Sequence, residues 1–96
     1  MKTGIELIAQ ERQEQIEKHG FTVGLDLLHN KYNQLSEGAS RLCEPDENKH
    51  EFYPPHEWDE ELWFKMIKKP YKERLIIAGA LIAAEIDRVQ NQTNLD

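Results

Sequence analysis

The segment from 70 to 90 constrains the fold most, because it puts apolar or small residues on most faces of a helix. At helical spacing these residues form two adjacent strips, one small and one large. The small strip consists of Ile76, Gly79, Ala80 and Ala83, and the large one of Leu75, Ile82, Ile86 and Val89. So wide an apolar girdle on 96 residues predicts one partner surface inside the chain and one on another chain. We therefore expect a homo-oligomer formed through the 70–90 helix, in which the small strip allows close approach.

Three further segments repeat apolar residues at helical spacing, and no segment alternates as a strand would. The first of them opens with Thr3 and Glu6 in the spacing of a capping box. The pattern predicts one all-α domain over 1–96, a small bundle of three to four helices. The expected helices cover 3–19, 25–42, 57–68 and 70–90, with a polar loop at 43–56 and a frayed tail at 91–96.

Composition limits the class of partner and the compartment. The net charge of −6 argues against binding to duplex nucleic acid, which requires a basic face. A single cysteine, Cys43, forms no disulfide framework, so we expect a reducing, cytoplasmic setting. The longest apolar run, "LIIAGALIAA", is too short to cross a membrane, and the charges near the N-terminus are unlike those of a signal peptide.

Aromatic side chains gather between 51 and 70, beside lysines at the end of the same segment. Rings next to cations can hold a base and its phosphate, and they can equally supply the mass of a small core. The spacing of Trp58 with Leu62 and Met66 predicts that Trp58 is the more buried tryptophan. Trp63, which lies beside that face, is predicted to be the more available for a ligand.

Carboxylates are the second candidate for chemistry. When acids from several helices face inward, they can hold Mg²⁺, whereas most acids on helices are solvated. Glu85 follows a run of apolar or small residues, so it is expected to face inward and to need Arg12 or Arg88 as a partner. We predict no resident metal, with Mg²⁺ required only if the protein is a hydrolase. The candidate catalytic residues in that case are Glu11, Glu14, Glu85 and Asp87.

The chain resembles a family of short phage-encoded helical proteins in two stretches, "ELIAQERQEQIEKHGFT" and "LIIAGALIAAEIDRVQ". Members of that family pair an opening like ERQxQxxxxGW(S/T) with a closing AGALIxAEIDR, and a tryptophan-bearing segment lies between. The middle of this chain departs from the family pattern GWTxEHD…GELxxAA. Leu25 stands in place of its histidine, and Gln34 in place of its glutamate.

The resemblance and the aromatic segment together lead to one hypothesis, the sequestration of a nucleotide-like ligand without catalysis. Viral nucleotide sponges of the anti-CBASS kind act in this way on cyclic nucleotide immune signals, inside the cytoplasm of an infected bacterium. The candidate ligand-binding residues are Phe52, Tyr53 and Trp63 for stacking, and Arg12, Lys65, Lys69 and Arg74 for phosphate.

Two alternatives stay open. The architecture is similar to that of all-α MazG-type NTP pyrophosphohydrolases, which would imply Mg²⁺ and the four acids named above. The ExD spacing in "AEIDR" and the glutamine at position 34 weaken that reading. The third alternative is an inhibitor whose acidic surface binds a basic host protein.

Overall fold

A computed structural model describes residues 1–19, 33–46 and 53–95, and every structural statement below concerns these residues. They form four α-helices and no strand, which confirms the all-α prediction. The helices are α1 (Gly4–His19), α3 (Gln34–Leu42), α4 (Glu60–Ile67) and α5 (Tyr71–Leu95). None of the described helices is both long and apolar enough to span a membrane.

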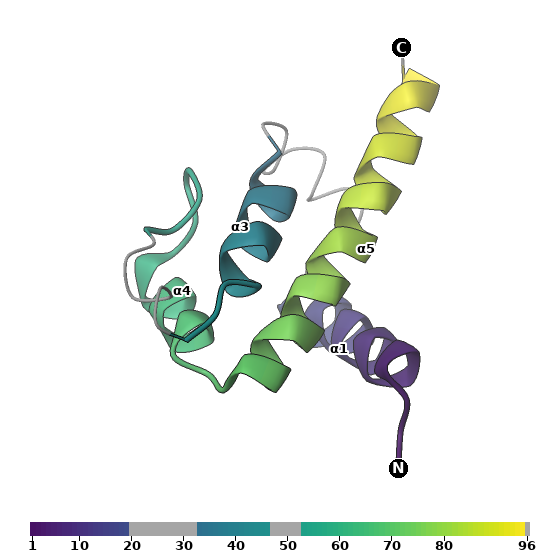
Figure 1. Cartoon of the computed structure of the whole chain (residues 1–96). Helices are drawn as coiled ribbons and strands as arrows, with labels where there is room; N and C mark the ends of the chain where they lie inside the picture. The colour runs from purple at the N-terminus through teal and green to yellow at the C-terminus, as the bar shows by residue number, and fades with distance from the viewer. Residues whose placement is uncertain (20–32, 47–52, 96) are drawn as a thin grey trace.

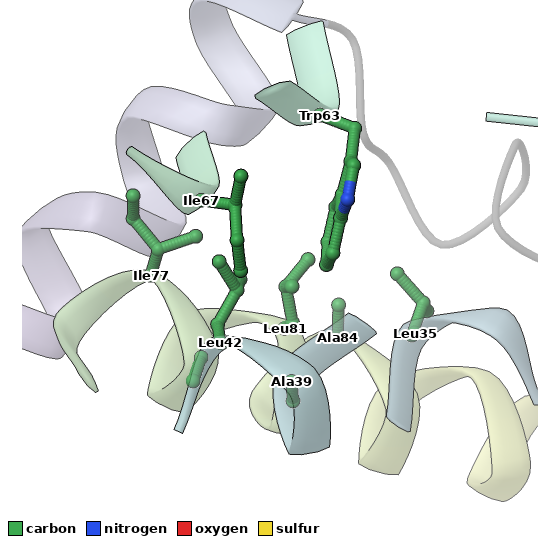
Figure 2. Packing of buried hydrophobic residues seen from close by; sticks show 9 residues of the cluster. Leu35, Ala39, Leu42, Trp63, Ile67, Ile77, Leu81 and Ala84 are labelled. Atoms are coloured by element: carbon green, nitrogen blue, oxygen red, sulfur yellow. The ribbon is translucent and has the colours of Figure 1, made fainter. Parts of the chain in front are cut away.

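The long helix α5 is the axis on which the other three helices pack. Figure 1 shows α3 beside the middle of α5, α4 beyond α3, and α1 crossing the lower half of α5. The apolar core lies where α3, α4 and α5 meet (Figure 2). Its buried residues are Leu35, Ala39, Leu42, Trp63, Ile67, Ile77, Ala78, Leu81 and Ala84. By contrast, the buried residues of α1 are polar, namely Arg12 and Gln15.

The helix boundaries agree with the sequence prediction for α1 and differ for the others. The capping box at the start of α1 is formed: the Thr3 N–H donates to Glu6 Oε1 at 3.0 Å, and the Glu6 N–H donates to Thr3 Oγ1 at 3.2 Å. The described part of the second helix begins at Gln34, and positions 25–32 of the prediction lie outside the described residues. The last helix continues to Leu95, five residues beyond the end predicted at position 90. No proline or glycine follows position 79, so nothing in the sequence stops this helix earlier.

The start of α4 corrects the prediction for the two tryptophans. Asp59 is the N-cap of this helix and accepts a hydrogen bond from the Glu61 N–H at 3.1 Å. The helix therefore begins at Glu60, and Trp58 lies outside it. The buried face of α4 is then defined by Trp63 and Ile67, which are one turn apart. Trp63 is 0% exposed and Trp58 is only partly buried, so the predicted order of burial was wrong.

Candidate functional site

The small-residue strip of α5 is occupied inside the chain. A Cβ atom added at Gly79 would lie 2.5 Å from Cδ1 of Ile8, so α1 crosses α5 closely at this glycine. Ala80, the next residue of the strip, is fully buried. The strip is therefore the surface of α5 that packs inside the chain, against α1, and oligomerisation through another face of this helix stays a prediction.

The large strip of α5 faces outward instead. We call it the α5 stripe, and it consists of Leu75, Ile82, Ile86 and Val89, which are 39%, 43%, 53% and 47% exposed. Adjacent positions on α5 point into the core, since Ala78 and Leu81 are each 1% exposed. A tyrosine one turn before the stripe, Tyr71, is also exposed. Large aliphatic side chains left in solvent along one helix face are typical of a binding surface.

The acids of α5 beside the stripe are paired within the chain. Glu85 accepts two hydrogen bonds from Arg88, at 2.6 Å from Nε and 3.2 Å from Nη2. Arg88 is buried and also donates from Nη2 to Asn33 Oδ1 at 3.2 Å, which ties α5 to the start of α3. Asp87 lies 3.5 Å from Nη2 of Arg12 on α1. The prediction that Glu85 faces inward and pairs with an arginine is confirmed, with Arg88 as its partner.

Polar side chains also line the contact between α1 and α5. Gln15 is 3% exposed and donates from Nε2 to Glu11 Oε2 at 3.3 Å. Its Oε1 atom is buried and has no hydrogen-bond partner. Arg12 is buried in the same helix and is held beside Asp87. The pair of Arg12 with Asp87 therefore joins α1 to α5, whereas the hydrogen bond of Gln15 stays within α1.

The four acids proposed for a hydrolase do not gather at one point. Glu85 and Asp87 face two different arginines, and Glu11 bonds to Gln15 on its own helix. Among the described residues, no group of three or more His, Cys, Asp or Glu side chains could hold a metal ion. Two of these acids help to fix the fold: Asp87 pairs with Arg12 of α1, and Glu85 holds the Arg88 that bonds to Asn33 beside α3.

Arg74, proposed to bind phosphate, is fully buried and is used to hold backbone. Its Nε donates to the carbonyl of Lys69 at 3.1 Å, and its Nη1 donates to the carbonyls of Leu42 at 2.8 Å and Glu44 at 2.6 Å. Its Nη2 donates to Asp46 at 2.6 Å. The guanidinium therefore caps the C-terminal end of α3, and the prediction of a phosphate contact here was wrong.

The remaining candidates for a nucleotide site are not gathered in one place by any described contact. Tyr53, Lys65 and Lys69 are exposed, whereas Arg12 is buried and Phe52 lies outside the described residues. Arg41 donates from Nη1 to the Tyr53 carbonyl at 2.6 Å, which fixes the backbone of an exposed ring. No described contact brings this tyrosine to the two lysines.

Sequence reasoning missed the structural role of Arg74, although it named Arg88 as a possible partner of Glu85 and the same signal was present for both arginines. Both arginines share one helix face with Ile77 and Leu81, at steps of three, four and seven residues. A cation on the core face of a helix must be paired or bonded to carbonyls. Those positions therefore indicate structural arginines and not ligand contacts.

Comparison of the chain with models of known protein families, with curated protein sequences and with solved structures finds no match. The function is therefore argued from the geometry. In the part of the chain that the structure describes, the α5 stripe is an exposed apolar face on the helix that every other described helix packs against.

Proposed function

We propose that the protein works by binding a polypeptide through the α5 stripe, as a small helical docking module. The observation that carries this proposal is the exposure of Leu75, Ile82, Ile86 and Val89 on one face of α5. This is a protein-binding function, like the third alternative above, but it uses an apolar face and not an acidic surface.

The spacing of the stripe suits a helical partner. Leu75, Ile82 and Val89 are seven residues apart, which is close to two turns, so they lie along one line of α5. Ile86 lies one turn beyond Ile82 and widens that line. Anchors at such spacing are what an amphipathic helix uses when it packs against a second apolar surface.

Burial of the α5 stripe by a partner would contribute a substantial free energy of binding for so small a protein. Covering a large aliphatic side chain yields about 25 cal/mol for each Å² removed from water. A domain near 100 residues buries a limited fraction of its own surface, so its intrinsic stability is modest. A partner that binds only the folded state would add to that stability by mass action.

The test measures whether the stripe is covered when the protein is at work. Ile82→Cys is made in a Cys43→Ser background, because Cys43 is exposed and would react. Ser40→Cys, at an exposed position of α3, is the matched control. We expect maleimide to label both thiols equally in dilute purified protein, and to label the Ile82→Cys thiol far more slowly in the cells that make the protein. Equal labelling of the two thiols in both settings would show that nothing docks on the stripe.

Sequestration of a nucleotide-like ligand is the second candidate, and one observation favours it. Tyr53 is 79% exposed, and Arg41 donates to its carbonyl, so the backbone that carries this exposed ring is held in place. A stacked base is worth about 1–3 kcal/mol. Calorimetric titration with cyclic and linear nucleotides should therefore give binding that Tyr53→Ala weakens and that Tyr71→Ala leaves unchanged. Absence of binding for the unmodified protein would dismiss this candidate.

A further inference from the structure

We infer that the polypeptide covering the α5 stripe is a second copy of this chain, packed antiparallel about a twofold axis that passes beside Ile82. This inference rests on the proposed docking function and names its partner.

The stripe is symmetric about its middle residue. Ile82 lies seven residues after Leu75 and seven before Val89. A twofold rotation beside Ile82 brings Leu75 of one copy onto Val89 of the other, and Ile82 onto its own counterpart. Every large apolar residue on this line then meets another, as an interface between identical surfaces requires. A seven-residue repeat drifts only about 20° per repeat around a straight helix, so the contact persists over the whole stripe.

Charge does not oppose this pairing, although each chain carries a net charge of −6. Between positions 75 and 89 the sequence contains two acids, Glu85 and Asp87. Glu85 is held by Arg88 and Asp87 lies beside Arg12, so both are neutralised inside their own chain. Two stripes can therefore approach without placing unpaired acids of the two copies against each other.

The distribution of lysines selects the antiparallel direction. Lys68, Lys69 and Lys72 are exposed at the start of α5. A parallel pair would bring the lysines of both copies together at one end. With the twofold axis beside Ile82, position 72 lies level with position 92 of the other copy, so an antiparallel pair puts Lys72 beside the other copy's last helical turns, where the helix dipole is negative. The two helix dipoles are then also aligned favourably.

Disulfide crosslinking tests both the partner and the direction. Single cysteines are introduced by Leu75→Cys, Ile82→Cys and Val89→Cys, each in the Cys43→Ser background. With mild oxidation of purified protein, Ile82→Cys should crosslink to itself. Leu75→Cys and Val89→Cys should each stay uncrosslinked alone and should form a disulfide-linked mixed dimer when combined. Strong self-crosslinking of Leu75→Cys and of Val89→Cys would mean a parallel pair and would overturn the antiparallel arrangement.

Sedimentation equilibrium of the unmodified protein is the second measurement. We expect a dimer that Ile82→Glu weakens roughly 100-fold, since a charge would replace a central apolar anchor. Ser40→Glu adds the same charge at an exposed position of α3 and should leave the dimer unchanged. Ile82 is exposed in the single chain, so the helical circular dichroism of Ile82→Glu should match that of the unmodified protein.

The two experiments distinguish a failure of pairing between two copies from a failure of the docking function. A monomer at every concentration, or a dimer that Ile82→Glu does not weaken, would overturn pairing with a second copy through the stripe. If the protein is monomeric and the Ile82→Cys thiol is still protected in cells, the docking function stands with a different polypeptide as the partner. If that thiol is labelled freely in both settings, the docking function falls as well.

Discussion

The indole of Trp58 stands edge-on to that of Trp63, with 5.9 Å between the ring centroids and 66° between the ring planes. Trp63 belongs to α4 and is fully buried among residues of α3 and α5 (Figure 2). Trp58 precedes α4 and rests on α3, because a Cβ atom at Gly38 would lie 2.7 Å from its Cη2 atom. The outer ring therefore covers the inner one.

This arrangement predicts unequal costs for removing the two rings. Trp63→Ala should lower the free energy of unfolding by about 3–5 kcal/mol, because it leaves a large cavity in the core. Trp58→Ala should cost clearly less, since this ring is only partly buried and its loss opens the site to water instead of leaving a void. Urea unfolding monitored by circular dichroism measures both values. Equal losses would mean that the outer ring is as much a part of the core as the inner one.

The sequence predicted the helices better than it predicted which face of α4 is buried. Spacing alone offered two faces, one through Trp58 and Leu62 and one through Trp63 and Ile67. The choice depends on where the helix begins, and the cap at Asp59 sets that point. With the start at Glu60, the first tryptophan falls outside the helical period, so its spacing no longer determines its burial.

The buried guanidinium of Arg74 should be one of the costliest side chains to remove. Its loss would leave the carbonyls of Leu42, Glu44 and Lys69 without their donor. A buried polar group left unpaired costs about 1–3 kcal/mol, so we expect Arg74→Met to destabilise the fold by about 3 kcal/mol or more.

Arg41→Met is the control for the Arg74 variant. It removes the same charge, but Arg41 is partly exposed and bonds to Glu37 and to one carbonyl. We expect a loss of about 1 kcal/mol or less from this variant. Thermal and urea unfolding of the pair give the comparison. If both variants lose the same stability, the carbonyl contacts of Arg74 do not stabilise α3.

The use of arginines and acids within the fold could be predicted only in part. The inward position of Glu85 followed from the apolar residues before it, and so did its need for an arginine. Which arginine pairs with Asp87 depends on how α1 crosses α5, and that crossing is set by contacts far apart in the sequence. At the same crossing, α1 covers the small-residue strip of α5, whereas the α5 stripe stays exposed.

Acid should weaken the start of α1. The Thr3 N–H and hydroxyl hold the pKa of the Glu6 carboxylate below its ordinary value of 4.5, chiefly through the backbone hydrogen bond. Because the folded-state pKa is the lower one, this stabilisation is present above pH 4.5 and is lost as pH falls through the lowered pKa. The stability difference between the unmodified protein and Glu6→Gln should therefore shrink as the pH is lowered from 6 to 3. A difference that stays constant over that range would mean that the capping box does not form.

The crossing of α1 and α5 at Gly79 gives the sharpest test of the fold. Alanine in place of glycine inside a helix normally stabilises it by about 1 kcal/mol. Here the added Cβ atom would lie 2.5 Å from Cδ1 and 2.7 Å from Cγ1 of Ile8, so α1 or its side chain must move. Overpacking of this kind costs about 1–3 kcal/mol, and we expect Gly79→Ala to be destabilising in spite of its helix propensity.

The same substitution should change sign when Ile8 is shortened. In an Ile8→Ala background the added Cβ atom meets no isoleucine side chain, so Gly79→Ala should stabilise the protein by up to about 1 kcal/mol. Gly4→Ala, where no atom lies within 4 Å of the new Cβ, controls for the general effect of alanine in a helix. Urea unfolding of the four members of the cycle measures the coupling. If Gly79→Ala has the same effect with and without Ile8→Ala, then α1 does not pack against this glycine, and the small-residue strip is free for another partner.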